Sequence, residues 1–171
     1  MNKLDTVAVA SRSFSQNDEL VQHLQSKYSS VIFNNFGKTL EGDELVNFLM
    51  PATKAIIGIE DLSESVLKRL PKLKVISKYG VGLNNLDLKL LKKRNIRLGF
   101  TPGVNKQSVA ELALALMLIG LKKIQENNRE IIEGNWPQEK GSELYGKNIG
   151  LLGFGNIGQK LASLLQPFNC K

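Results

Sequence analysis

Residues 147–165 read KNIGLLGFGNIGQKLASLL, an apolar run followed by three spaced glycines and then by a helical pattern. Glycines at this spacing are a weak signal alone, but they become specific when a strand precedes them and a helix follows. We therefore predict a buried strand over Lys147–Leu152 and a helix over Gln159–Leu165. Together they form the first strand–turn–helix unit of a Rossmann domain.

Each glycine of this turn has a physical role in holding a dinucleotide. Gly153 permits the tight turn out of the strand, and Gly155 leaves space for a pyrophosphate to approach the backbone. Gly158 lets the helix pack closely against the strand. The amides of Asn156 and Ile157 then point at the phosphates from the positive end of the helix. The alternative is a strand-to-helix turn that only needs glycines for its geometry.

The sequence stops soon after this turn. A dinucleotide turn is followed, about 20 positions later, by an acidic residue that holds a ribose hydroxyl, and the chain ends at Lys171 before that position. A single strand–helix unit cannot bury its own apolar face. We expect residues 102–171 to be an incomplete, truncated cofactor domain that is only marginally ordered unless something covers it.

Upstream, short apolar runs rich in β-branched residues recur at regular intervals. They are Thr6–Ala10 (TVAVA), Val31–Phe33 (VIF), Lys54–Ile59 (KAIIGI), Lys74–Ser77 (KVIS) and Ile96–Gly99 (IRLG). Segments with helical periodicity lie between them, at Asn17–Lys27, Ser63–Leu70 and Leu86–Arg94. Strands that alternate with helices predict an α/β fold with a doubly wound parallel sheet. Five strands suit the flavodoxin-like arrangement.

The pattern changes after residue 101. Asn105–Lys123 is a long segment that is apolar almost all round, which predicts a helix buried between two domains. A second, amphipathic helix is expected over Lys123–Glu133. We place the domain boundary near residues 100–104, with a substrate domain at 1–101 and the interdomain helices and cofactor unit at 102–171.

The bulk composition excludes several classes of protein. A single cysteine, Cys170, precludes an internal disulfide framework, so a reducing, cytoplasmic setting is expected. The longest apolar stretch, about ten residues at Leu112–Leu121, is too short to span a bilayer. The net charge of +7 is spread over scattered lysines and arginines without a nucleic-acid motif. We expect no nucleic-acid or membrane partner, although a mild positive field would attract anionic substrates.

Two loops that follow predicted strands carry informative residues. The first is Lys78-Tyr79-Gly80-Val81-Gly82, where two glycines one residue apart allow backbone amides to converge on an anion such as a carboxylate. Lys78 would add positive charge there, and a glycine-rich turn with a surface lysine is the alternative. The second loop, Thr101–Asn105, enters the long helix, and either Asn105 or Ser108 could cap that helix.

In combination, three runs are more specific than their parts. LKVISKYGVGLNNLDL (residues 73–88), TPGVNKQSVAELALALML (101–118) and GSELYGKNIGLLGFGNIGQ (141–159) together resemble the D-isomer-specific 2-hydroxyacid dehydrogenases. Within that family the chain looks most like the phosphoglycerate dehydrogenase and glyoxylate/hydroxypyruvate reductase branches. The resemblance is strongest from Leu73 to Lys171 and covers the N-terminal half of the family pattern.

The resemblance implies hydride transfer between NAD, or NADP, and C2 of a small 2-hydroxy or 2-oxo acid. On matching positions, the substrate carboxylate would lie at Lys78, Tyr79, Gly80, Val81 and Gly82. The nicotinamide side of the cofactor would lie along Asn105 and Val109. Its pyrophosphate would be held by Gly153, Phe154, Gly155, Asn156, Ile157 and Gly158. The family form is a homodimer, and the acid substrate could resemble 3-phosphoglycerate.

No catalytic residue can be assigned in this sequence. In the resembled family an arginine, an acidic residue and a histidine come from the later half of the cofactor domain. His23 is the only histidine and is placed far from the expected cleft, and Cys170 has no histidine partner. One histidine and one cysteine do not make a metal site. We expect no turnover from this chain alone, and the alternative function is that of a truncated fragment or split half that works with a partner chain.

Overall fold

The computed structural model describes residues 5–137 and 139–171 and divides the chain into two compact units. The first unit ends at Pro102 and the second begins at Gly103. This division falls one residue after the boundary expected from the sequence.

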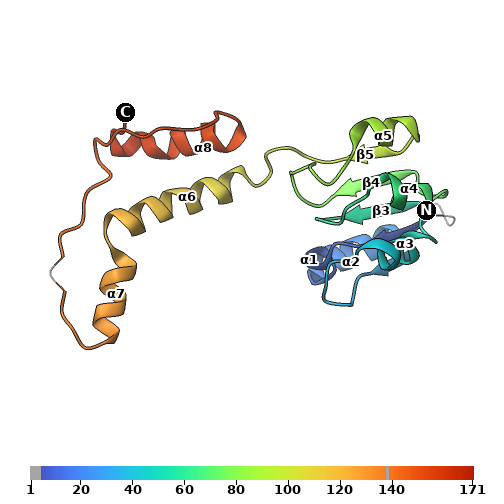
Figure 1. The fold of residues 1–171 in the computed structure, drawn as a ribbon, viewed down its shortest axis with the longest axis horizontal. Coiled ribbons are helices and arrows are strands. Elements are labelled where there is room, and N and C mark those ends of the chain that lie inside the picture. The colour runs from blue at the N-terminus through green and yellow to red at the C-terminus, as the bar shows by residue number, and fades with distance from the viewer. Residues whose placement is uncertain (1–4, 138) are drawn as a thin grey trace. The chain divides into compact units, whose positions relative to one another are not determined.

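The first unit is built on one parallel sheet with the strand order β2-β1-β3-β4-β5. Its strands are β1 (Thr6–Val9), β2 (Ser30–Phe33), β3 (Lys54–Ile57), β4 (Val75–Lys78) and β5 (Arg97–Gly99). Figure 1 shows the strands side by side, with helices between successive strands. This order is the flavodoxin-like one, which confirms the predicted α/β fold.

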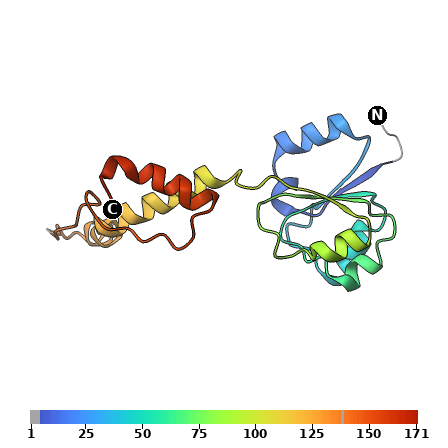
Figure 2. The ribbon, with the colours of Figure 1, turned by 90° about the horizontal axis from the view of Figure 1, so that it is seen from above.

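Helices cover both faces of this sheet. One face carries α1 (Arg12–Ser15) and α2 (Asp18–Lys27), and the other carries α3 (Gly42–Leu49), α4 (Glu64–Lys68) and α5 (Leu88–Lys93) (Figure 2). Side chains of β1 alternate between the two cores: Val7 and Val9 pack with Phe14, whereas Ala8 packs with the α3–α5 side. A strand buried on both faces is expected to be continuously apolar, as TVAV is.

The predicted elements of this unit are present, and none of their ends is shifted by more than two residues. Hydrogen bonds between backbone groups and caps decide those ends. Asp87 caps α5 by accepting from the amides of Lys89 and Leu90. Two helices were missed, α1 and α3, although Leu45, Val46 and Leu49 of α3 have the apolar spacing of a buried helix face and are fully buried.

The second unit consists of helices. They are α6 (Lys106–Leu121), α7 (Ile124–Ile132), α8 (Asn156–Leu165) and a short 3-10 helix, η1 (Gln166–Phe168). Its core forms where α6 packs against α8, around Ala110, Leu144, Leu161 and Leu165. No helix in the described parts of the chain is long and apolar enough to cross a membrane.

The predicted strand at Lys147–Leu152 is wrong. Within the described residues of the second unit no strand is assigned, and Leu152 is fully exposed. A strand needs a partner, and this segment has only the last residue of the chain: the amide of Ile149 donates to the Lys171 carbonyl (2.8 Å), and the Lys171 amide donates to Lys147 (2.9 Å). These two bonds have the pattern of a parallel pair without the strand that would extend it.

Two further expectations for this unit are corrected. The long helix α6 is not buried all round, because Leu112 and Leu116 are more than half exposed and Ala110 is its one buried residue. One face of α6 packs on α8, and nothing described covers the other. The helix after the glycine turn begins at Asn156 rather than Gln159, since the amide of Gln159 already bonds to the carbonyl of Gly155.

Candidate functional site

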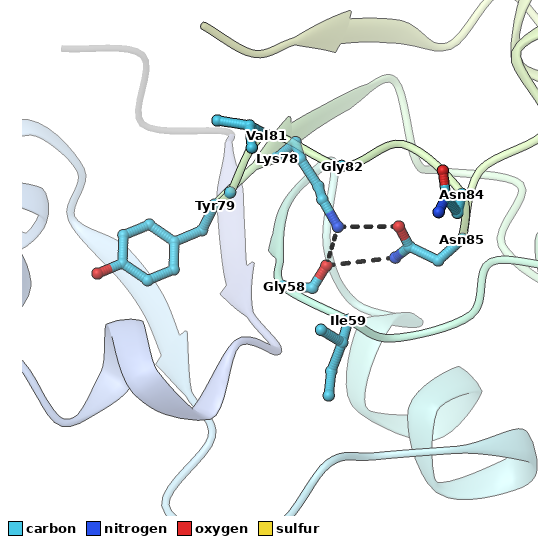
Figure 3. Close-up of a pocket in the computed structure, with 9 residues that line it drawn as sticks. Gly58, Ile59, Lys78, Tyr79, Val81, Gly82, Asn84 and Asn85 are labelled. Atoms are coloured by element: carbon cyan, nitrogen blue, oxygen red, sulfur yellow. Dashed lines mark hydrogen bonds between the residues drawn. The ribbon is translucent and has the colours of Figure 1, made fainter. Parts of the chain in front are cut away.

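A hollow opens in the first unit at the carboxyl ends of β3 and β4, the edge where parallel sheets bind ligands. Its volume is about 320 Å³. Figure 3 shows its lining, in which the predicted loop Lys78–Gly82 faces the turn that follows β3. The lining residues are Gly58, Ile59, Lys78, Tyr79, Gly80, Val81, Gly82, Asn84 and Asn85. All five predicted substrate residues therefore lie around one cavity.

The ammonium of Lys78 is fixed inside this hollow. It donates to the carbonyl of Gly58 and to Asn85 Oδ1, the latter at 2.8 Å. Asn85 is oriented in turn, because its Nδ2 donates to the carbonyls of Gly58 (3.2 Å) and Glu60 (2.6 Å). An ammonium has three N–H groups, so one remains available to a ligand. Lys78 is thus no ordinary surface lysine, and Asn85, which we did not single out from the sequence, determines its position.

Burial lowers the pKa of Lys78 below its ordinary value of 10.5, and the negative charge of Glu60 opposes that shift. A charged group that is partly removed from water and held by neutral acceptors interacts more strongly with an incoming anion than a solvated one does. In its protonated form the lysine can therefore attract a carboxylate.

The backbone of the loop offers a narrower set of donors than expected. The amide of Tyr79 donates to the carbonyl of Ile57 (2.7 Å) and so continues the sheet ladder, which makes it unavailable to a ligand. The amides of Gly80, Val81 and Gly82 have no acceptor among the described residues. We call these three amides with Lys78 the carboxylate cradle. Tyr79 contributes its ring, which packs edge-on against Phe14 with centroids 5.3 Å apart.

The two glycines of the cradle differ in whether the local structure requires a glycine. Gly80 has φ +133°, a conformation that side chains with a Cβ rarely adopt. Gly82 has no such torsion, and a Cβ built on it would meet nothing within 4 Å. Neither backbone geometry nor packing explains Gly82. The space in front of it is open to a ligand.

A second hollow of about 300 Å³ adjoins the first, and we did not predict it. It shares Gly58, Ile59 and Tyr79 with the cradle hollow and adds residues that follow β1, β2 and β3. The added residues are Ser11, Arg12, Ser13, Thr39 and Glu60. The polar run Ser11-Arg12-Ser13, directly after a buried strand, was the sequence signal that could have indicated it.

In the second unit the glycine turn has two positions that the local fold requires to be glycine. Gly153 has φ +97°. A Cβ on Gly158 would lie 2.6 Å from the carbonyl oxygen of Gly153, so the first turn of α8 packs on the glycine turn itself rather than on a strand. These two positions are explained by structure alone.

Gly155 is the exception, and it bears on cofactor binding. Its torsions are ordinary, and a Cβ there would meet nothing within 4 Å. The amides of Asn156, Ile157 and Gly158 in the first turn of α8 have no acceptor among the described residues, no side chain caps the helix, and no acidic residue lies there. Free amides at the positive end of a helix, with open space before them, suit a pyrophosphate. The residues present therefore fit a dinucleotide.

The predicted nicotinamide-side residues lie on α6. Asn105 occupies the position before the helix but makes no capping bond, and its Oδ1 is buried with no hydrogen-bond partner in the described structure. Val109 is half-buried one turn further on. Gly103, with φ +73°, lies directly against the Asn156 side chain, where a Cβ would be 2.8 Å from its Cγ. The start of α6 and the start of α8 are therefore neighbours in this unit.

The residues set aside as catalytic candidates line neither of the two hollows. His23 is exposed on α2, and Cys170 belongs to the edge of the α6–α8 core. Over residues 5–137 and 139–171, no three His, Cys, Asp or Glu side chains gather in a way that could hold a metal ion.

Comparison with known proteins identifies the relatives of this chain. Residues 7–163 match the family model for the catalytic domain of the D-isomer specific 2-hydroxyacid dehydrogenases. A hydroxypyruvate reductase from Thermotoga maritima is 36% identical over 135 residues, which is 77% of this chain and 44% of that protein. The human glyoxylate reductase/hydroxypyruvate reductase is 39% identical over 117 residues, which is 63% of this chain and 36% of that protein.

Solved structures agree. The NAD-dependent formate dehydrogenase from Staphylococcus aureus, in complex with NAD, superposes with a TM-score of 0.77 at 27% identity, covering 97% of this chain and 54% of that one. A dehydrogenase from Rhizobium meliloti gives a TM-score of 0.74 at 32% identity, covering 96% of this chain and 57% of that one. The chain spans half or less of the length of the curated relatives it matches. It belongs to the D-isomer specific 2-hydroxyacid dehydrogenase family.

Proposed function

We propose that this chain supplies the substrate-carboxylate site and the pyrophosphate site of an NAD(P)-dependent oxidoreductase. The reaction is hydride transfer between the nicotinamide and C2 of a small 2-hydroxy or 2-oxo acid. One paired observation carries the proposal: Gly82 and Gly155 each stand at a predicted anion site, and neither packing nor backbone torsion requires glycine at either position.

At the carboxylate cradle, the acid group would receive hydrogen bonds from the amides of Gly80, Val81 and Gly82. Lys78 would add charge through its remaining N–H. Bonds of this kind to an ionised acceptor are stronger than neutral ones. They would fix the acid in one orientation, with C2 held in place for reaction.

At the glycine turn, the first-turn amides of α8 would hold the cofactor pyrophosphate. The cofactor would supply the hydride chemistry, while the protein binds and orients it. The unpartnered Oδ1 of Asn105 lies at the start of the neighbouring helix and is suited to accept a hydrogen bond from a carboxamide of the cofactor. NAD is our proposed cofactor, and NADP fits the same turn equally well.

We also propose that the proton-transfer group is supplied by polypeptide outside this chain, in a full-length cytoplasmic homodimer or by a partner chain. The exposed apolar side of α6, with Leu112 and Leu116, supports a need for further polypeptide. The chain alone would then bind ligands without oxidising a 2-hydroxy acid. Dehydrogenase turnover by the purified 171-residue protein would overturn this part of the proposal.

The test is amide-resolved NMR on this chain. Glycolate should shift the resonances of Gly80–Gly82, and NADH should shift those of Gly155–Gly158. The substitutions Gly82→Ala and Gly155→Ala should each abolish the corresponding shifts without lowering Tm. Gly99→Ala and Gly120→Ala are matched controls, since an added Cβ has no contact closer than 4.0 Å at either site. If the controls weaken binding as much, or if neither ligand shifts these amides, the proposed function is wrong.

A further inference from the structure

Glu60 is the one charged residue in the buried set of the described chain, with only 2% of its surface exposed. It follows β3 and lies beside the carboxylate cradle, but nothing in the proposed function uses it. Burying a carboxylate is costly unless it is paired or fully hydrogen-bonded. Its presence therefore needs a reason.

Only one of its two oxygens is accounted for. Glu60 Oε2 accepts from the amide of Gly58 at 2.6 Å. Oε1 has no hydrogen-bond partner among the described residues, and it is not one of the fully buried polar atoms, so it is accessible from the hollow; no lysine or arginine described in the structure comes within ion-pair distance. The bond to Gly58 fixes the carboxyl group, and the side chain lines the second hollow.

That hollow is positioned to receive the far end of a ligand. It shares Gly58, Ile59 and Tyr79 with the cradle hollow, so an acid bound at the cradle would extend into it past these residues. In Figure 3 the Tyr79 ring and the Ile59 side chain both point away from the Lys78–Asn85 contact, and both residues also line the second hollow. Its other polar lining residues are Ser11, which is only 2% exposed, Arg12, Ser13 and Thr39.

We propose that Glu60 is a specificity-determining residue, which accepts a hydrogen bond from a hydroxyl group on C3 of the acid substrate and disfavours a second anionic group there. The proposal rests on the proposed function, because it needs the acid group at the cradle. A fixed, partly desolvated acceptor binds a hydroxyl well and repels a carboxylate or phosphate. Lys78 alone suggests extra negative charge on the substrate, but Glu60 offsets that preference.

Arg12 lines the same hollow, and its positive charge would favour the second anionic group that Glu60 disfavours. It is exposed at the rim, and its Nη1 donates to the carbonyl of Gly37 at 3.4 Å. A solvated guanidinium interacts weakly with an anion compared with a buried carboxylate at the same hollow. The field at the inner wall is therefore that of Glu60.

Three ligands that differ only at C3 test the inference on the full chain. D-lactate ends in a methyl group, D-glycerate in a hydroxymethyl group and D-malate in a carboxymethyl group. We expect D-glycerate to bind about tenfold more tightly than D-lactate, and D-malate to bind more weakly than both, as measured from the shifts of Gly80–Gly82 in NMR titrations. In Glu60→Gln, the glycerate preference should fall several-fold and the affinity for D-malate should rise several-fold.

Glu19→Gln is the matched control, because Glu19 is an exposed acid on α2 that lines neither hollow and makes no ion pair in the described structure. It should leave the order of the three ligands unchanged. If the acids shift the cradle amides with equal affinity, the role of Glu60 is wrong and the cradle stands. If D-malate binds most tightly, Arg12 governs the hollow and the inference is also wrong. If none of the acids shifts the cradle, the proposed function itself fails.

Discussion

The carboxylate cradle and the glycine turn are both glycine-rich loops whose backbone amides are available to an anion, but their surroundings differ. Around the cradle, a five-stranded sheet is covered on both faces, and Asn85 fixes Lys78 through its own bonds to the turn after β3. Around the glycine turn, the preceding segment has two backbone bonds to one residue, and Leu152 and Phe154 are exposed. The same type of loop is rigidly supported in one unit and lightly supported in the other.

The difference shows that the support of a loop depends on the strands and helices from which it emerges. The cradle amides are held because β3 and β4 pair on both sides within the first unit. The turn amides are held mainly by the packing of α8 on α6 and by the close approach of Gly158 to Gly153. We therefore expect perturbations of the first unit to be costly and global, and those of the second to be smaller and local.

The largest effect is expected from truncating the core behind the cradle. Leu49→Ala removes a fully buried side chain of α3 and should destabilise the first unit by about 2–5 kcal/mol, because the cavity left behind cannot be filled. Leu116→Ala on the exposed side of α6 is the control and should change stability by less than about 0.5 kcal/mol. Urea unfolding followed by circular dichroism measures both. Equal losses would mean that α6 is covered in solution.

The next effect sharpens the contrast within the glycine turn. Gly158→Ala places a Cβ 2.6 Å from the carbonyl oxygen of Gly153. It should lower the free energy of unfolding by about 1–3 kcal/mol and also weaken NADH binding. Gly155→Ala has open space and should spare stability while weakening NADH binding. Thermal unfolding and NADH fluorescence titration separate the two outcomes. A stable Gly158→Ala variant would contradict the close packing of α8 on the turn.

A smaller effect concerns the pH dependence of the cradle. Because burial lowers the pKa of Lys78 below 10.5, its positive charge is lost at lower pH than that of an exposed lysine. Glycolate affinity should therefore fall as pH rises through that lowered pKa, and it should be nearly constant over the same range in Lys78→Met. The unfolded chain binds more protons in this interval, so the free energy of unfolding should rise with pH there. Constant glycolate affinity up to pH 10.5 would exclude the lysine from the site.

The smallest effect involves an ion pair at the amino ends of β1 and β3, two inner strands of the sheet. Asp5 accepts from Lys54 at 2.8 Å and from Thr53 at 3.0 Å, and these two hydrogen bonds lower the pKa of Asp5. A carboxyl whose folded pKa is lowered stabilises the fold above its unfolded pKa and loses that contribution as pH falls through the folded value. In Asp5→Asn, the free energy of unfolding of the first unit should therefore depend slightly less on pH below about pH 4. Acid titration of both proteins by circular dichroism checks this, and identical curves would count against the pair.

Much of the first unit could be predicted from the chain. Runs such as TVAVA and KAIIGI are mostly apolar without alternation, as expected for strands buried on both faces, and the helices between them have apolar faces of the right spacing. Of the two missed helices, α1 is a single turn, and α3 lies between two predicted strands in a segment for which we predicted no element. The strand predicted at Lys147–Leu152 failed for a physical reason, since apolar composition favours a strand but its hydrogen bonds depend on a neighbour.

The candidate site divides in the same way. Local sequence supplied Lys78–Gly82 and Gly153–Gly158, because glycine spacing after a strand has a local cause. It did not supply Asn85 or Glu60, whose significance lies in bonds to Gly58, more than 20 residues from Asn85 along the chain. It also could not show that the amide of Tyr79 is engaged by Ile57.

By itself, then, the sequence determined the α/β class, the positions of both candidate anion-binding loops and the family, since each depends on residue types at short spacings. Only the tertiary structure decided which amides are free, that Lys78 is fixed in a hollow, and that a buried carboxylate lies beside it. The reason is that a hydrogen bond or a buried charge depends on which distant segments the fold brings into contact, and parallel strands bring together loops that are far apart in the chain.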